Sequence, residues 1–205
     1  MSFIIIIIIT TTFISSLDEA VCFVGGRTFS VDLSPVENEN EAWLAISAST
    51  SQDPDTRMTT FETSAVQIWR VGMNKNNEMS APKYCYSLAV EHGPAMAVKF
   101  CQQTPEKSFL AIAGSGQDRS LISIVALPPA SKISGVIPTV YRCLTGVHLV
   151  ATDDISNNLE TFDSLRVTCI DWSQDGVLLA AALHDATVCL WRFDSLSPLV
   201  YSVLI

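Results

Sequence analysis

A short pattern of apolar residues occurs three times along the chain, and this repetition constrains the fold more than any other feature of the sequence. Each copy has an alternating strand, a polar turn, a strand built on Leu-Ala, a second turn and another alternating strand. The expected strands lie at residues 29–34, 43–47 and 65–71, then 96–101, 109–113 and 121–125, and finally 167–173, 177–182 and 187–192. Leu33, Phe100 and Trp172 align at one position, so the unit recurs, although its loops differ in length.

A fourth strand is expected to follow each copy, at residues 84–90, 140–150 and 199–205. Within the last alternating strand, Val188 and Leu190 share one face, and Cys189 and Trp191 share the other. Since both faces carry apolar groups, we expect this strand to be covered on both sides by neighbouring sheets. The pattern therefore predicts an all-β chain with three four-stranded sheets, at about 21–90, 91–150 and 165–205.

The third copy, residues 167–192, resembles a WD-repeat blade of a β-propeller almost position by position. This resemblance implies that the turn aspartate, Asp185, accepts hydrogen bonds that tie together the loops of the blade. It also implies that Trp191 packs and hydrogen-bonds within the same blade. We expect these two residues and Trp172 to be structural.

The other two copies resemble the WD repeat less closely. The second has Asp118 at the turn, with Val125 where a tryptophan is expected. The first keeps Trp69 but replaces the short turn by a polar insert, residues 49–64. Asp118 and Trp69 are accordingly predicted to be structural blade residues as well.

The length of the chain limits how much of a propeller it can form. With 205 residues, it has room for one ordinary domain. Propellers close with four to eight blades, whereas three units are recognisable here. The expected fold is therefore an all-β WD-repeat propeller that is partial, with three four-stranded blades plus terminal strands.

A closer resemblance comes from three segments of the first half. A glycine pair opens residues 25–32, the polar insert 49–64 precedes a V-x-I-W strand, and a tyrosine-containing strand in 86–93 leads to a His-Gly turn. This combination is similar to the WD-repeat propeller subunit of transcription factor IIIC, the general factor for RNA polymerase III genes. The chain departs from that family at Arg27 and Leu33, where the family usually has Pro and Trp.

The resemblance implies a non-catalytic protein-interaction scaffold in the nucleus. Its expected partners are other protein subunits, in particular a second propeller subunit of the factor IIIC complex, with DNA bound only indirectly through the assembly. Two alternatives remain open. One is a generic WD-repeat adaptor of ubiquitin or chromatin machinery, and the other is a secreted propeller-fold binder or enzyme.

The charge composition bears on direct nucleic-acid binding. The chain has 12 Lys and Arg against 21 Asp and Glu, which gives a net charge of −9. Because attraction to a phosphate backbone grows with the number of cations brought to it, this composition is unfavourable for a chain that grips DNA alone.

The first 20 residues form an Ile- and Thr-rich segment with six consecutive isoleucines, Ile4 to Ile9. The segment resembles the apolar part of a signal peptide, which would favour the secreted alternative. However, it lacks a basic start and a small-residue cleavage pattern, and it is too short to span a bilayer. We interpret it as a low-complexity leader or an extra strand, and no membrane association is expected.

The motifs and spacings of the sequence predict no catalytic, metal-binding or cofactor-binding residue. The glycines at 114 and 116 precede a strand instead of a helix, which favours a turn over a phosphate loop. The acidic stretches 53–55 and 153–154 are expected to be solvated loops. Cysteines and histidines are dispersed without metal-ligand spacing, at Cys22, Cys85, Cys101, Cys143, Cys169, Cys189, His92, His148 and His184.

Overall fold

The computed structural model describes a chain whose regular elements, within the described residues, are all strands. Three sheets of four or five strands and one two-stranded sheet account for them. The described residues are 5–7, 20–22, 24, 27–34, 41–49, 64–72, 80, 82–90, 94–101, 109–114, 120–127, 140–142, 146–150, 166–184, 186–193 and 199–204.

We use "blade" as a name for each of the three larger sheets. The sheet named the first blade is formed by β3 (Arg27–Leu33), β4 (Glu41–Ser49), β5 (Ser64–Gly72) and β6 (Lys83–Val90). These four strands follow one another in an antiparallel meander. A short fifth strand, β10 (Val140–Arg142), joins the outer edge in parallel with β6. β4 and β5 include the strands predicted at 43–47 and 65–71, on either side of the polar insert.

The second blade consists of β7 (Ala97–Phe100), β8 (Phe109–Ala113), β9 (Ser120–Ala126) and β11 (Gly146–Val150). The sequence predicted one outer strand over residues 140–150, and this was wrong. The segment contains two strands that belong to different sheets, because β11 pairs with β9 whereas β10 pairs with β6.

The third blade comprises β12 (Val167–Trp172), β13 (Leu178–Leu183), β14 (Thr187–Arg192) and β15 (Leu199–Leu204), all antiparallel. Apart from the blades, β1 (Ile5–Ile7) in the isoleucine run pairs with β2 (Ala20–Cys22). In the described part of the chain, no helix is long and apolar enough to cross a membrane.

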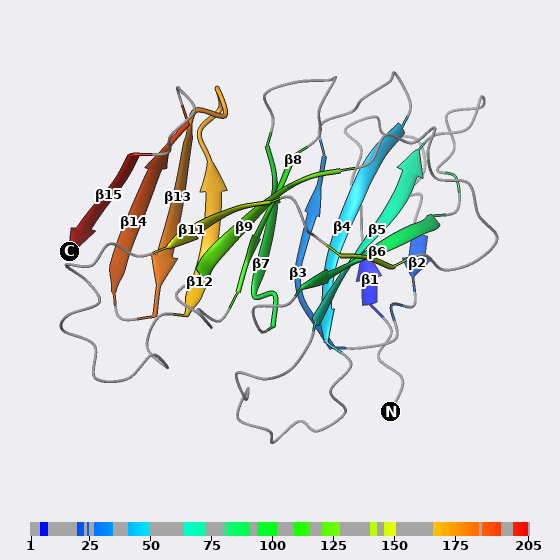
Figure 1. Ribbon diagram of the computed structural model, residues 1–205. Coiled ribbons are helices and arrows are strands. Elements are labelled where there is room, and N and C mark those ends of the chain that lie inside the picture. The colour runs from blue at the N-terminus through cyan, green and yellow to red at the C-terminus, as the bar shows by residue number, and fades with distance from the viewer. Residues whose placement is uncertain are drawn as a thin grey trace.

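The three blades lie side by side in chain order, with β3, β7 and β12 as neighbouring first strands (Figure 1). Apolar residues fill the two spaces between them. Side chains of the first and second blades share one core, which includes Ile68, Tyr86 and Phe100. Side chains of the second and third blades share another, which includes Ile122 and Trp191.

The face of the first blade that points away from the second blade has a smaller core. There Leu44, Ile46 and Val71 pack with Val24 from the segment that precedes β3. The amide of Gln67 reaches the same segment by donating a hydrogen bond to the carbonyl oxygen of Val24 at 2.7 Å. The first blade is thus packed on both faces.

The third blade is not buried in the same way. Thr187, Cys189 and Trp191 on one face of β14 are buried, whereas Val188 and Leu190 on the other face are only partly buried. The expectation that neighbouring sheets cover this strand on both sides is thus met for one face within the described residues, and the other face is partly buried. Within the described residues, only the second blade packs against the third, and it covers one face.

Hydrogen bonds to side chains fix the turns and crossings that connect these strands. The N–H of Ala95, just before β7, donates to Ser64 Oγ at 2.8 Å, and the carbonyl oxygen of Ala95 accepts a hydrogen bond from Ser47 Oγ. Both serines belong to the first blade, so they anchor the entry to the second. Because Ala95 is fully buried, its backbone groups need such partners.

Candidate interaction surface at the inner strands

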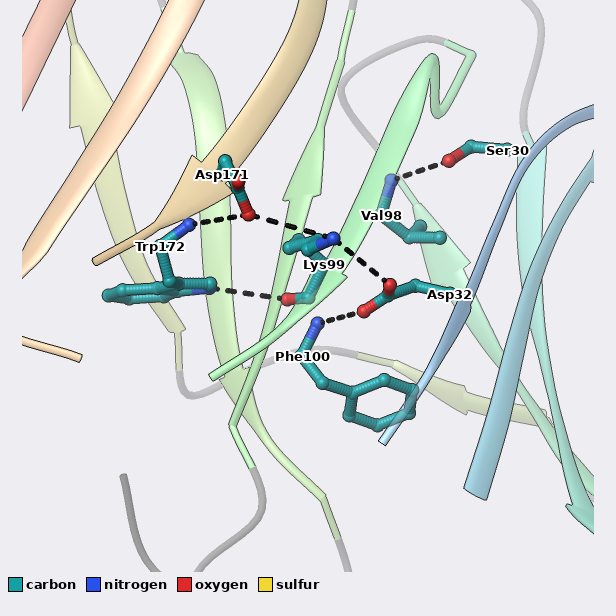
Figure 2. A network of polar contacts seen from close by, with 7 residues as sticks. All are labelled: Ser30, Asp32, Val98, Lys99, Phe100, Asp171 and Trp172. Carbon is teal, nitrogen blue, oxygen red and sulfur yellow. Dashed lines mark hydrogen bonds and ion pairs between the residues drawn. The ribbon is translucent and has the colours of Figure 1, made fainter. Parts of the chain in front are cut away.

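The innermost strands of the three blades carry a connected set of polar contacts (Figure 2). Leu33, Phe100 and Trp172 occupy aligned positions in the three copies of the sequence pattern, so the residues that precede them are also equivalent. Those preceding residues are Asp32, Lys99 and Asp171. The fold brings all three together, with the lysine between the two aspartates.

Side chains of β3 complete the hydrogen bonding of β7. Asp32 Oδ2 accepts the backbone N–H of Phe100 at 2.7 Å, and Ser30 Oγ accepts the N–H of Val98 at 3.2 Å. Alternate residues of a strand present their backbone groups to opposite edges, so these two N–H groups lie on the edge of β7 that β8 does not use. The first blade therefore satisfies an edge that would otherwise present free donors.

The lysine of β7 forms ion pairs with the strands on both sides. Lys99 Nζ lies 3.3 Å from Asp32 Oδ1 and 3.6 Å from Asp171 Oδ1. The two aspartates differ in exposure, since the Asp32 side chain is 16% exposed and that of Asp171 is 73% exposed. Because exposed ion pairs contribute little to stability, the Asp32 pair is the more important of the two for the fold.

The electrostatics of this cluster keep the lysine charged. Burial alone would lower the pKa of Lys99, but the charges and hydrogen bonds of Asp32 and then Asp171 outweigh it and raise that pKa above its usual value. A lysine with a raised pKa is protonated at neutral pH and lacks the free amine that a nucleophile or base requires. The cluster is suited to binding and positioning, and it does not supply an activated amine.

Trp172 connects the third blade to the second. Its indole Nε1–H donates a hydrogen bond to the carbonyl oxygen of Lys99 at 3.3 Å, and its ring packs against Phe193 with a centroid distance of 5.4 Å. The ring also contacts the core between the two blades. A residue expected to be structural thus lies at the junction of two inner strands.

Trp191 is fully buried in the core between the second and third blades. Its indole N–H has no hydrogen-bond acceptor among the described residues. The residues paired with Trp191 across the sheet are Leu179 on β13 and Val200 on β15, and Ala181 and Cys189 are its neighbours on the buried face. None of these four side chains carries a hydroxyl or a carboxylate. The packing role implied by the resemblance agrees with this position, but the hydrogen-bonding role finds no partner there.

Trp69 lies on the far side of the first blade. Its Nε1–H donates to Gln67 Oε1 at 3.0 Å, and its ring meets Tyr84 edge-on at a centroid distance of 5.5 Å. Asp118 and Asp185, the two predicted turn aspartates, fall outside the described residues. Their structural role stays a prediction.

The turn between β12 and β13 shows what a described turn aspartate does in this blade. Asp175 Oδ1 accepts the N–H of Val177 at 3.1 Å and also the hydroxyl of Ser173. The hydrogen bond from Ser173, and to a smaller extent the one from Val177, lowers the pKa of the Asp175 carboxyl below its usual value. Gly176 follows with φ of 67°, the left-handed conformation in which a glycine is favoured.

The remaining titratable groups of the described chain do not gather into a further site. No group of three or more His, Cys, Asp and Glu residues within it is arranged to hold a metal ion. Among the described cysteines, Cys85, Cys101, Cys169 and Cys189 form no disulfide. Burial raises the pKa of the Cys85 thiol, although the nearby Arg70 and Lys83 act in the opposite direction. A thiol with a raised pKa is a weak nucleophile at neutral pH.

The sequence did not single out Ser30, Asp32, Lys99 or Asp171 as functional residues. A signal was nevertheless present, because the aligned position before Leu33, Phe100 and Trp172 alternates in charge along the three copies. A search for opposite charges at equivalent positions of neighbouring repeats would have found the cluster.

Comparisons with known proteins support a WD-repeat relationship for one part of the chain. Residues 157–192 match the family model described as WD domain, G-beta repeat, and this WD40 repeat supports the WD-repeat family. The match coincides with most of the third blade. No curated protein shows a significant match to the sequence.

Among solved structures, the chain is similar to a candidate 6-phosphogluconolactonase from Bacteroides uniformis. The two are 10% identical with a TM-score of 0.46, and the match covers 86% of this chain and 42% of the other. The chain thus spans less than half the length of that protein. A likeness of this size carries no inference about activity.

Proposed function

We propose that the chain is a non-catalytic protein-interaction scaffold. The observation that carries this proposal is the WD40 repeat at residues 157–192, which coincides with a well-packed blade that has one partly exposed apolar face. Repeat proteins of this architecture present sheet edges, loops and faces to other proteins.

We further propose that the scaffold is a nuclear subunit of the transcription factor IIIC complex. The motifs of the first half of the chain that resemble the WD-repeat subunit of that factor carry this finer assignment. In that complex, the expected partner of the chain is a second propeller subunit, and DNA is contacted only through the assembly. A generic WD-repeat adaptor is the second candidate, since the match to the WD-repeat family model favours it equally.

The charge of the chain is unfavourable for direct DNA binding, whether the chain is a factor IIIC subunit or a generic WD-repeat adaptor. The chain has a net charge of −9, and the one lysine on the described inner strands, Lys99, is paired with Asp32 and Asp171. A cation that is already neutralised by two carboxylates contributes little to phosphate binding.

A gel-shift titration at physiological salt tests the proposal, with a tRNA-gene promoter fragment as the probe. The purified chain alone should not shift the probe, whereas factor IIIC subunits together with the chain should do so. Tight, sequence-specific binding by the chain alone would contradict the scaffold assignment. If the chain fails to associate with factor IIIC subunits, the generic adaptor replaces the finer proposal.

A further inference from the structure

We propose that the outer edge of the first blade is a strand-addition site, at which an extended segment of another protein takes the place of β10. The inference rests on the scaffold function proposed above, for which it names the docking edge and the form of the partner. By the outer edge we mean the side of β6 that does not pair with β5. In this structure, β10 occupies part of that edge in parallel with β6.

The chain itself shows that this edge accepts an extended strand from elsewhere. β10 lies in the connection between β9 and β11, two strands of the second blade that pair with each other. Between them the chain leaves the second blade and pairs β10 with residues 87–89 of β6 in the first. A strand from another sheet is thus already held there by backbone pairing, which is the contact that strand addition uses.

β10 fills less than half of the edge. β6 has eight residues, Lys83–Val90, and pairs with β5 from one end to the other. β10 has three residues, which pair only with residues 87–89 of β6. It does not reach residues 83–85, and no other described strand pairs with this side of β6. A strand edge of this kind is a template for a further strand.

The sequence explains why β10 is short. Pro138 lies two residues before β10, in the direction in which a parallel strand would continue toward Lys83. A proline has no N–H to donate and is depleted from strands, so this continuation of β10 is disfavoured. At the other end, only residues 143–145 separate β10 from β11 in the second blade. A separate segment is free of both limits and can pair with more of β6.

Tyr141 indicates which side chain the partner segment should carry. Its ring meets that of Tyr86 edge-on, with a centroid distance of 5.3 Å and an interplanar angle of 85°, beside the core shared by the first two blades. Tyr86 is fully buried, so it forms a fixed apolar base at the edge. Val140 points to the opposite face and is 62% exposed. The partner segment therefore needs an aromatic residue opposite Leu88, and its neighbour faces solvent.

The pairing of β10 is suited to exchange. It consists of one short parallel segment, and parallel pairing is less stable per residue than antiparallel pairing. A longer partner segment adds backbone hydrogen bonds to residues 83–85, which β10 does not make. β10 then competes with the partner, and the apparent affinity is reduced by the fraction of chains in which the edge is open.

Peptide binding to the purified full-length chain tests the inference. The first probe is a fluorescein-labelled peptide with the sequence of residues 136–144, with Cys143→Ser to prevent oxidation. A second peptide also carries Pro138→Val, and a third carries Tyr141→Ala in addition. In fluorescence anisotropy, the Pro138→Val peptide should bind most tightly, and removal of the aromatic ring should weaken binding about tenfold.

Variants of the chain test the competition by β10. Tyr141→Gly removes the ring and weakens the pairing of β10, so it should raise the apparent affinity for the Pro138→Val peptide about tenfold. Tyr141→Phe keeps the edge-on contact with Tyr86 and is the matched control, with the affinity of the wild type. Circular dichroism and the thermal midpoint check that both variants are folded.

Hydrogen exchange of the backbone amides locates the bound peptide. Residues 87–89 should exchange faster in Tyr141→Gly and should regain protection when the peptide is bound. In the wild-type chain, saturating peptide should protect residues 83–85, which β10 does not reach. This second readout does not depend on the folding of a variant.

The inference is wrong if folded Tyr141→Gly binds none of the peptides, if the ring-deleted peptide binds as tightly as its parent, or if protection appears away from β6. A wild-type dimer that Tyr141→Gly abolishes would instead assign the edge to exchange of β10 between two copies. If a protein assembly is recovered from cells but the peptides do not bind, the scaffold function stands and this docking edge is wrong. If the peptides bind but no protein assembly is recovered, the scaffold function fails, and the proposed partner fails with it.

Discussion

The carboxylate of Asp32 on the first blade accepts the backbone N–H of Phe100 on the second blade at a distance of 2.7 Å. The same side chain, through its other oxygen, lies 3.3 Å from Lys99 Nζ. One residue thus binds both the edge and the side chain of the neighbouring inner strand. Its aligned counterparts, Lys99 and Asp171, extend this contact toward the third blade.

Asp32→Ala should destabilise the chain by about 2 kcal/mol, because it leaves the Phe100 N–H without its acceptor and Lys99 without its closer partner. Asp32→Asn should cost less, since the amide oxygen can still accept the N–H. Urea denaturation of the two variants measures this difference. Equal stability of Asp32→Ala and the wild type would show that the contact does not hold the first two blades together.

Trp191→Ala should cost about 3 to 5 kcal/mol, since it removes a large, fully buried side chain from the core between the second and third blades. Trp191→Phe should cost far less, because it also removes an indole N–H that has no acceptor among the described residues. The control is Gln174→Ala at an exposed turn position. A similar midpoint shift for all three variants would contradict the packing described for this blade.

The turn between β13 and β14 contains a non-glycine residue in a left-handed conformation, Ala186 with φ of 67°. Glycine adopts this conformation without steric cost, so Ala186→Gly should stabilise the chain by about 0.5 to 1 kcal/mol despite the extra entropy of the unfolded state. Gly176→Ala is the reciprocal test, because Gly176 has the same φ and a Cβ there should lower the stability by about 1 kcal/mol. A loss of stability in Ala186→Gly would show that the turn has another conformation.

Asp175 should contribute to the acid sensitivity of the chain. Hydrogen bonds from Ser173 and Val177 hold its pKa below the ordinary value of 3.8 in the folded state. Its stabilising contribution is therefore present above about pH 3.8 and is lost as the pH falls through the lower folded-state pKa. Thermal midpoints measured between neutral and acidic pH should fall less steeply for Asp175→Asn than for the wild type. If the midpoints of the variant and the wild type fall in parallel with pH, the pKa of the Asp175 carboxyl does not change on unfolding.

Much of the strand framework could be predicted from the sequence, because alternation and turn residues are local signals. The strand from Phe109 to Ala113 and the one from Thr187 to Arg192 were predicted with their observed bounds. The parallel pairing of β10 with β6 could not be predicted, since it joins Tyr141 to Leu88 across a long stretch of chain. No local pattern specifies such a partner.

The cluster of charged residues on the inner strands was not predicted from the sequence for a related reason. Asp32, Lys99 and Asp171 are ordinary surface-type residues in isolation, and only the alignment of the three copies makes them equivalent. The partial exposure of Val188 and Leu190 was also unpredictable, because alternation shows that a face is apolar but does not show what covers it.

Quantitative mass spectrometry of proteins bound to the tagged full-length chain, purified from its native cells after nuclease treatment, tests the scaffold function most directly. We expect a stable protein assembly that survives the nuclease, with subunits of factor IIIC present in near-equal amounts to the chain. A chain that is recovered without stoichiometric protein partners, or whose associations disappear when nucleic acid is removed, would contradict it.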